Sequence, residues 1–366
     1  MSDDLLYQIA LSQVPSIGDV HARLLINHFG NAKNVFAAPK KSLEKLDGLG
    51  FVRTNAIKSF AGFDACEQEI QFINKYRITP LFLTEKAYPR RLLHCYDAPP
   101  LLYFKGGANL NAPKIVSIVG TRSSSDYGKH VCDSLIEGLK QQDVVVVSGL
   151  AFGIDTIAHK AALKYGLSTV GVLAHGLDRI YPSQNKSLAK LMCECGGLLT
   201  EFRSKTNPDR ENFPRRNRIV AGMCDCIIVI ESGVRGGSLI TAELSNSYNK
   251  DVFAIPGRTN DMKSEGCNYL IKNNKANMIT TSADVLNLMN WNEDNKKVVR
   301  QQRELFIELS ATDQTVFDLI NAREGISIDD IFLSSRLSSS AVAASLLSLE
   351  MQGLIISLPG KMFRST

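Results

Sequence analysis

Short, almost continuous apolar runs alternate with amphipathic segments through the middle of the chain. Segments with helical spacing, such as KHVCDSLIEGLKQQ and DTIAHKAALKYG, separate the runs. Strands that are apolar on both faces and alternate with helices are typical of a parallel sheet covered on its two sides. The pattern therefore predicts an α/β fold, with a doubly wound, Rossmann-like domain over residues 113–290. The apolar runs, rich in Val and Ile, are 114–120, 144–149, 168–176, 226–232 and 251–257.

Residues 1–75 have helical periodicity instead. Two segments, 14–30 and 46–57, place a Gly-bearing turn before an apolar-periodic helix. This predicts a small helical domain of the helix-hairpin-helix (SAM-like) type, followed by a connecting segment over 76–112. The N–H groups of such a turn can face a phosphate, but glycine also ends helices in purely structural modules. We favour the structural interpretation and leave DNA contact by these turns open.

After residue 290 the chain is polar and charged, and then helical again. Residues 291–304 are predicted to be a linker, and residues 305–366 to be helices followed by a hairpin with Pro359-Gly360 at its tip. This order predicts a winged-helix-like domain, a class in which one helix often enters a DNA major groove. The segment SSAVAASLLSLEMQG, which corresponds to that helix, has no basic side chain. We therefore favour protein contact or packing over duplex binding.

Composition and charge narrow the class of protein. The 366 residues are 44% hydrophobic and 22% charged, as in water-soluble globular proteins. No apolar run reaches the roughly 18–20 residues of a membrane span, and the acidic start MSDDLLYQIALS is unlike a signal peptide, so we expect a cytoplasmic protein without membrane contact. The net charge is +5; residues 101–290 carry 22 basic and 17 acidic side chains, and residues 291–366 carry 8 and 10. A polyanion is therefore expected at the middle segment.

The sequence predicts neither a metal nor a cofactor. The eight cysteines include two C-x-C pairs, Cys193/Cys195 and Cys224/Cys226, but structural zinc sites use a wider spacing. Reduced and mostly buried thiols are the favoured interpretation. The first Rossmann-like turn lacks G-x-G-x-x-G, and no P-loop sequence is present, so NAD, FAD and ATP are not expected.

Gly- and Ser-rich turns follow nearly every predicted strand of the middle domain. They begin at residues 120, 148, 175, 231 and 255. In a doubly wound sheet, ligands bind beyond the carboxyl ends of the strands, where helix N-termini supply unpaired N–H groups. Arg122, Arg235 and Arg258 add formal charge to these turns. The sequence therefore predicts an anion-binding edge of the sheet.

The segment ENFPRRNRIVAG (211–222) opens a helix with three arginines, Arg215, Arg216 and Arg218. Positive side chains at this end oppose the helix dipole, so the placement is unfavourable without an anion. Phe213 offers a ring on which a base can stack, and Asn217 an amide that can contact a base edge. Stacking combined with cationic contacts is typical of single-stranded nucleic acid binding. We favour this hypothesis over a solvated basic helix start.

Two patterns leave enzymatic alternatives open. GGSLITAE (236–243) is similar to the GGxGTxxE signature of Rossmann-type nucleotide phosphoribohydrolases, but Glu243 falls two positions late. Two positions rotate a helical side chain by about 200°, away from the site. Asp155 and His159 share a helix face four residues apart; we favour a helix N-cap role for Asp155 and a packing role for His159.

Five motifs together resemble the DNA-processing protein A (DprA/Smf) family: GTR (120–122), SGLAFGIDTIAH (148–159), HGLDRIYPSQN (175–185), ENFPRRNRIVAG and GGSLITAE. The resemblance implies a non-enzymatic homodimer that binds single-stranded DNA entering by natural transformation, protects it, and helps to load the RecA recombinase. One position departs from the family pattern, because Ser183 stands where a basic residue is frequent; Lys186 is the candidate replacement. The predicted DNA-binding residues are Gly120, Thr121, Arg122, Ser148, Gly149, Lys186, Phe213, Arg215, Arg216, Asn217, Arg218, Gly237 and Ser238.

Overall fold

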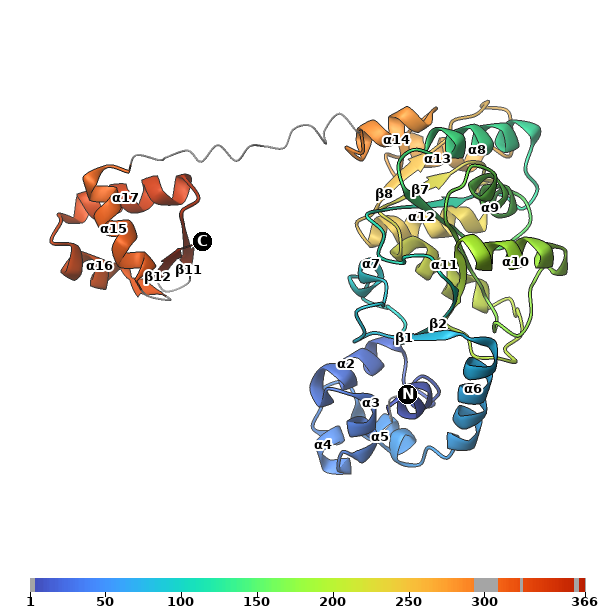
Figure 1. Ribbon diagram of the computed structural model, residues 1–366, viewed down its shortest axis with the longest axis horizontal. Coiled ribbons are helices and arrows are strands. Elements are labelled where there is room, and N and C mark those ends of the chain that lie inside the picture. The colour runs from blue at the N-terminus through green and yellow to red at the C-terminus, as the bar shows by residue number, and fades with distance from the viewer. Residues whose placement is uncertain (1–3, 293–308, 323–324, 359–361, 366) are drawn as a thin grey trace. The chain divides into compact units, whose positions relative to one another are not determined.

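The computed structural model describes residues 4–292, 309–322, 325–358 and 362–365 (Figure 1). The chain divides into two compact units, Met1–Trp291 and Asn292–Thr366, and each is described by itself. Most of the predicted linker and the predicted hairpin tip at Pro359-Gly360 lie outside the described residues.

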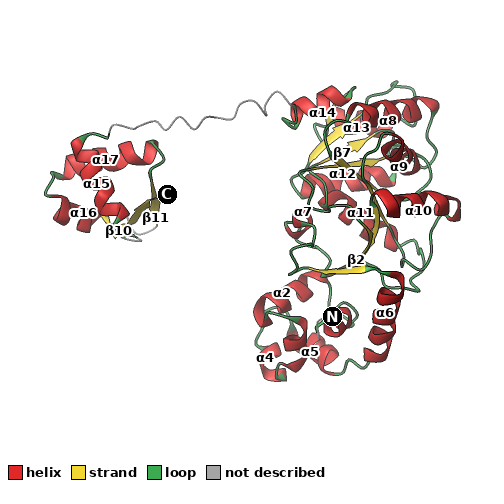
Figure 2. Cartoon of the chain, viewed as in Figure 1, coloured by secondary structure: helices red, strands yellow, loops and turns green. Residues whose placement is uncertain are grey.

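A nine-stranded sheet organises the first unit (Figure 2). The strand order is β1-β2-β6-β5-β4-β3-β7-β8-β9. The direction in which the chain adds strands changes at β3: β4, β5 and β6 follow on one side of it, and β7, β8 and β9 on the other. The strands β3 to β9 are all parallel. This confirms the predicted doubly wound, Rossmann-like sheet. The strands are β1 (Thr79–Phe82), β2 (Leu101–Gly106), β3 (Lys114–Val119), β4 (Val144–Ser148), β5 (Thr169–Val172), β6 (Gly197–Thr200), β7 (Cys226–Val229), β8 (Asp251–Ala254) and β9 (Asn277–Met278).

Helices cover both faces of this sheet (Figure 1). Successive side chains of a strand point to opposite faces, so Val116 and Ile118 of β3 pack in one core and Ile115 and Val119 in the other. The first face carries α8 (Asp126–Gly138), α9 (Ile154–Lys164), α10 (Lys186–Cys195) and α14 (Ser282–Leu288); the second carries α7 (Arg90–Leu93), α11 (Asn212–Gly222), α12 (Gly237–Ser247) and α13 (Glu265–Lys272).

The segment 76–112, predicted only to connect two domains, adds β1 and β2 to the sheet. Both strands pair antiparallel, β2 with β1 and with β6. Pro80 lies in β1 at the edge of the sheet, where its missing N–H does not interrupt a central ladder. Phe82 and Leu101 from these strands are buried in the core of the N-terminal helices. The helical module and the sheet therefore share packed residues.

The N-terminal module consists of six short helices around one apolar core. Gly48 and Gly50 have φ values of +84° and +63°, in the left-handed region that glycine adopts without strain. The Gly-bearing turn predicted in 46–57 therefore forms at Gly48-Leu49-Gly50. The helices are α1 (Leu5–Leu11), α2 (Asp19–Phe29), α3 (Ala32–Ala37), α4 (Lys40–Glu44), α5 (Gly50–Lys58) and α6 (Phe63–Tyr76).

The second unit has the element order of a winged helix. Its small sheet has the order β10-β12-β11, and its core includes Val316, Ile331 and Leu346. Within the described ranges, no single helix is long and apolar enough to cross a membrane; only α16 and α17 taken together, bent by 119°, satisfy length and composition. The elements are α15 (Ala311–Asn321), β10 (Ile326–Ser327), α16 (Ile328–Ser335), α17 (Ser339–Met351), β11 (Ile355–Leu358) and β12 (Met362–Ser365).

Candidate functional site

A small hollow that opens to solvent lies at the carboxyl ends of β3, β4 and β5, and we call it the Arg122 pocket. Three predicted residues meet there: Arg122 from the turn after β3, and Phe213 and Arg216 from α11. The loops after β4 and β5 supply the rest of the wall, as expected for a ligand site in a doubly wound sheet. The other lining residues are Leu150, Ala151, Phe152, Val172, Leu173, Ala174, His175, Tyr181 and Pro182.

An exposed cation and several aromatic rings surround the opening of the pocket. The guanidinium carbon of Arg122 lies 5.2 Å from the centroid of the Phe213 ring, within cation–π range. The Tyr181 ring lies 6.2 Å from Phe213 at an interplanar angle of 63°. Tyr181 and Phe152 are 48% and 45% exposed. Sequence reasoning missed both rings, although they lie in the motifs HGLDRIYPSQN and SGLAFGIDTIAH.

Arg216 places a second positive charge in the wall of the pocket. The residue is only 6% exposed; its Nη1 donates to the Val172 carbonyl at 3.0 Å and lies 4.0 Å from Asp155 Oδ2. Its buried Nε–H has no hydrogen-bond partner among the described residues. Burial lowers the pKa of Arg216 and raises the pKa of Asp155. Because arginine keeps its proton in proteins, Arg216 remains a buried cation, and its Nε–H is a hydrogen-bond donor without an acceptor among the described residues.

Two glycines allow this arrangement. A Cβ at Gly149 would lie 1.6 Å from Arg216 Nη1 and 2.4 Å from Asp155 Oδ2. Gly153 has φ +76°, and a Cβ there would lie 2.2 Å from the Thr121 carbonyl oxygen. Both motif glycines therefore serve close packing under the pocket.

Two buried histidines stabilise the loops of the pocket in their neutral form. His175 Nδ1–H donates to the Gly176 carbonyl at 2.9 Å, and Nε2 accepts from the Tyr181 N–H at 3.2 Å; burial lowers the pKa of His175. His159 is fully buried, with Nε2 2.5 Å from the Gly149 carbonyl and Nδ1 2.7 Å from Thr169 Oγ1. These contacts give both histidines positioning roles.

The structure corrects the N-cap expectation for Asp155. The N-cap of α9 is Gly153, and Asp155 lies in the first helical turn. Its carboxylate accepts from the Ala151 N–H at 3.2 Å and faces Arg216. Asp155 therefore supports the loop after β4 and the buried guanidinium.

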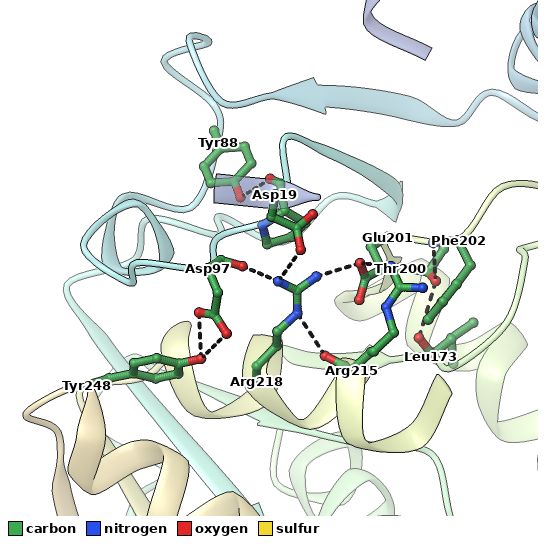
Figure 3. A network of polar contacts seen from close by, with 11 residues as sticks. Asp19, Tyr88, Asp97, Leu173, Thr200, Glu201, Phe202, Arg215, Arg218 and Tyr248 are labelled. Atoms are coloured by element: carbon green, nitrogen blue, oxygen red, sulfur yellow. Dashed lines mark hydrogen bonds and ion pairs between the residues drawn. The ribbon is translucent and has the colours of Figure 1, made fainter. Parts of the chain in front are cut away.

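The structure also separates the three arginines of α11 that the sequence placed on one anion: Arg216 lines the pocket, whereas Arg215 and Arg218 contact Glu201 (Figure 3). Arg218 is buried, and its guanidinium donates to Glu201 Oε2 at 2.6 Å, to Asp19 Oδ2 at 2.7 Å and to the Asp97 carbonyl. Arg215 pairs with the same Glu201 oxygen at 2.9 Å. Residues three apart on a helix share a face, so 213 and 216 face the pocket while 215 and 218 face the helical module. Helical periodicity alone could have predicted this division.

The buried ion-pair network links α11 to the N-terminal module. Burial raises the pKa of Glu201, whereas Arg218 and Arg215 lower it. For Arg218, burial lowers the pKa, but the nearby Glu201 and Asp19 carboxylates together raise it above its usual value. Asp97 continues the network, because its carboxylate accepts from the Tyr248 hydroxyl at 2.7 Å. The pocket helix is thus tied to α2 and α12.

Comparison with known proteins identifies the family. Residues 79–290 match the family model described as DNA recombination-mediator protein A. The chain belongs to the DNA recombination-mediator protein A family. Residues 306–361 match the DprA winged helix domain, in agreement with the predicted winged helix.

One relative is similar to this chain over almost its whole length, and another over about half of it. Protein Smf of Synechocystis sp. is 30% identical over 98% of both chains. DNA processing protein DprA of Streptococcus pneumoniae is 43% identical over 56% of this chain and 72% of its own.

Two solved structures of family members are similar to part of this chain. The Streptococcus pneumoniae DNA processing protein A has a TM-score of 0.66 and 33% identity, over 78% of this chain and 98% of its own. DNA processing protein A from Helicobacter pylori, studied for its single-stranded DNA binding mode, has a TM-score of 0.54 and 30% identity, over 59% and 96%.

The remaining predicted residues of this family member lie outside the pocket wall. Ser148 Oγ donates to the Ile118 carbonyl at 2.6 Å, and Ser238 Oγ to Ser232 Oγ at 2.7 Å. These hydroxyls are therefore engaged inside the fold. Thr121 N–H donates to the Glu231 carbonyl at 2.8 Å, and Gly120 packs against Ile154. Gly237 and Lys186 are exposed at the starts of α12 and α10, and Asn217 is half-buried on α11.

The alternative catalytic glutamate faces away from the pocket. Glu243 is exposed and pairs with Lys275 at 3.1 Å. The eight cysteines are free; Cys195 is exposed, Cys193 half-buried and the rest buried. In the ranges that the structure describes, no three His, Cys, Asp or Glu side chains form a group able to hold a metal ion.

Proposed function

We propose that the protein binds single-stranded DNA in the Arg122 pocket and acts in DNA processing during natural transformation without being an enzyme. The observation that carries the proposal is the Arg122 guanidinium 5.2 Å from the Phe213 ring, beside a buried Arg216 with an unpartnered Nε–H. Arg122 contacts a phosphate, the buried Arg216 adds positive charge to the wall of the pocket, and a base stacks on Phe213 or Tyr181. The family membership supports the same class of activity.

The pocket selects an unpaired strand. A base can stack on Phe213 only after it leaves a duplex, because its faces are covered there by neighbouring bases. The wall offers cations and aromatic faces rather than a set of groups that reads base edges. Binding is therefore expected to be sequence-tolerant and salt-dependent.

The other predicted residues keep narrower proposed roles. Lys186, Gly237 and Asn217 are proposed to contact flanking phosphates or base edges outside the pocket wall. Arg215 and Arg218 are proposed to hold α11 in place, because their guanidiniums are engaged by Glu201.

Fluorescence anisotropy with matched single- and double-stranded oligonucleotides tests this proposal. Arg122→Ala and Phe213→Ala are each expected to weaken single-strand binding by about tenfold or more, alike for all sequences. Lys164→Ala is the control, since Lys164 is exposed at the C-terminal end of α9 and pairs with Asp133. Equal affinity for duplex, or a loss limited to one base composition, contradicts the proposal.

The phosphoribohydrolase alternative has a separate test. Incubation with nucleoside monophosphates is expected to release no base, because Glu243 is paired with Lys275 away from the pocket. Release of base that Glu243→Gln abolishes would establish the enzyme instead.

We further propose that the protein is a cytoplasmic homodimer that helps to load the RecA recombinase. The family description as a recombination mediator supports this role. Exposed apolar side chains on α12 and α13 and between them, Ile240, Met262 and Tyr269, are suited to a protein contact. Sedimentation tests the dimer, and a monomer would contradict that part of the proposal. RecA-dependent ATP hydrolysis on single strands coated with single-strand-binding protein tests the loading role. If the protein does not accelerate this hydrolysis, the loading role is contradicted.

A further inference from the structure

A second basic and aromatic surface lies next to the Arg122 pocket. A hollow that opens to solvent, larger than the Arg122 pocket, separates α6 of the helical module from the loop 203–209 that leads into α11. We call this region, with the side chains that continue it along α6, the α6 surface. It comprises Phe72, Lys75, Tyr76, Lys105, Arg203 and Lys205.

The aromatic part of the α6 surface is exposed and flanked by ammonium groups. The rings of Phe72 and Tyr76 lie 4.7 Å apart, and Tyr76 is 43% exposed. The Nζ atoms of Lys75 and Lys105 lie 5.4 and 5.6 Å from the centroid of the Tyr76 ring. Both ammonium groups lie over the ring, so a base that stacks on Tyr76 displaces one of them, and the freed ammonium group can then contact a phosphate.

The charge of the α6 surface is available to a ligand. Arg203 and Lys205 are exposed, and no cation of this surface forms an ion pair with a carboxylate in the described part of the chain. The carboxylate of Glu69 in the same hollow is buried and accepts from the N–H and hydroxyl of Ser204. Asp209, which is exposed, is the other acidic residue of the lining. The lining of the hollow therefore carries two basic and two acidic residues, and the positive excess of the α6 surface comes from Lys75 and Lys105 beside Tyr76.

The α6 surface shares a wall with the Arg122 pocket. The loop 175–181 lines the pocket through His175 and Tyr181. On its other side, this loop is bonded to 203–207: Gly176 N–H donates to the Thr206 carbonyl at 3.2 Å, and the Lys205 N–H to Asp178 Oδ1 at 2.9 Å. The exposed Arg179 bridges the loops through Asn207.

We propose that the α6 surface is a second single-strand subsite, which receives the same strand after it leaves the Arg122 pocket past Arg179. A base stacks on Tyr76, and the phosphates on either side contact Lys205 and Lys105. This inference rests on the proposed function, since it extends the path of the same strand. Such paths occupy about 4–16 nucleotides in other single-strand-binding folds, more than one pocket holds.

The experiment compares two oligothymidylate lengths by fluorescence anisotropy on the full chain. Oligomers of about 6 nucleotides fill the Arg122 pocket alone, whereas those of about 25 reach both sites. Tyr76→Ala and Lys205→Ala are each expected to weaken binding of the long oligomer about 5- to 30-fold and to leave the short one unchanged. For Lys205→Ala, the salt slope of the long oligomer falls by about one. Lys164→Ala, which removes a cation elsewhere, changes neither length.

The outcomes separate the two proposals. If Arg122→Ala weakens both lengths while Tyr76→Ala and Lys205→Ala change neither, the α6 subsite is overturned and the proposed function stands. If Arg122→Ala changes the binding of neither oligomer, the proposed function is contradicted, and the α6 subsite that rests on it is contradicted as well. Tyr76→Phe retains the ring and is expected to bind the long oligomer as the native chain does. A Tyr76→Ala loss that is equal at both lengths shows damage to the fold and overturns the subsite.

Discussion

Arg216 keeps its charge in a nearly water-free position because the backbone at residue 149 leaves room for it. Gly149→Ala places a methyl group 1.6 Å from the guanidinium, and a buried arginine held by Val172 and Asp155 cannot swing away freely. We expect a loss of about 1–3 kcal/mol in unfolding free energy, typical of overpacking. Single-strand binding is expected to weaken as well. Urea denaturation and anisotropy measure the two effects.

The matched control for this substitution is Gly107→Ala. A Cβ at Gly107 meets no atom within 4 Å, so the change is expected to stay within about 0.5 kcal/mol. A native-like Gly149→Ala variant would show that Arg216 is not held as tightly as its contacts indicate.

His159 makes stability depend on pH. Its pKa is lowered to about 4, chiefly by burial, whereas in the unfolded chain it titrates near 6.5. The unfolded state therefore binds the proton first, so stability is complete above about pH 6.5 and falls by up to about 3 kcal/mol as the pH approaches 4. His175, whose pKa burial also lowers, acts in the same direction. Thermal unfolding midpoints across this range measure the effect.

Two buried carboxyls oppose this trend. The raised pKa values of Asp155 and Glu201 add stability at low pH, which is lost as the pH rises through their folded values. His159→Gln isolates the histidine contribution, because the variant should lose part of the pH dependence between about 4 and 6.5. His130→Gln, at an exposed site on α8, should change nothing. An unaltered profile in His159→Gln would mean that the histidine is not buried as described.

One face of helix α11 lines the proposed DNA-binding pocket, and the other face contacts the N-terminal helical module. Phe213 and Arg216 face the pocket, whereas Arg218 is buried against Glu201 and Asp19. Arg218→Ala leaves the Glu201 carboxylate buried without this partner and is expected to cost about 3–5 kcal/mol. The single tryptophan, Trp291, packs on the core of the first unit, so its fluorescence in urea follows unfolding of that unit.

Arg215→Ala is the internal control for the attachment face. Arg215 contacts the same Glu201 oxygen, but its side chain is 54% exposed, so its removal should cost less than about 1 kcal/mol. The double variant Arg218→Met with Glu201→Gln should recover part of the Arg218→Ala loss, since it removes both buried charges. Equal costs for the two arginines would contradict the buried network.

At the scale of elements, the features that could be predicted from the sequence are those with a local pattern of apolar residues or turn residues. The strands β3 to β8 each lie in a Val- and Ile-rich or apolar stretch, and Arg122 and Phe213 follow from their turns. Strand β9 consists of two residues, both exposed. It has no apolar run, so the sequence did not predict it. The positions of Tyr181 and Arg218 in the fold depend on contacts with residues distant in sequence: the Tyr181 ring lies near Phe213, and Arg218 pairs with Asp19. Arg218 was misplaced because the arginines were treated as one cluster instead of two helix faces.

At the scale of the whole molecule, the proposed DNA-binding apparatus belongs to one of the two compact units. The Arg122 pocket and the α6 surface both lie within Met1–Trp291. The sequence from 291 to 366 carries 8 basic and 10 acidic side chains, so it adds no favourable field for a polyanion. On α17, the exposed Leu347 and Met351 favour a protein contact over a DNA groove.

Removal of residues 292–366 is therefore expected to leave single-strand affinity within about twofold of the full chain. The logarithm of affinity should fall with the logarithm of salt concentration with a slope near −3 in both proteins, if about four phosphates are neutralised. Anisotropy titrations from low to physiological salt measure both quantities, with Arg122→Ala in each background as the control that the same pocket is probed. Loss of binding on truncation, with a smaller slope, would place DNA recognition in the winged helix instead. Because the slope counts displaced counterions and not stability, it separates this result from simple misfolding of the shortened chain.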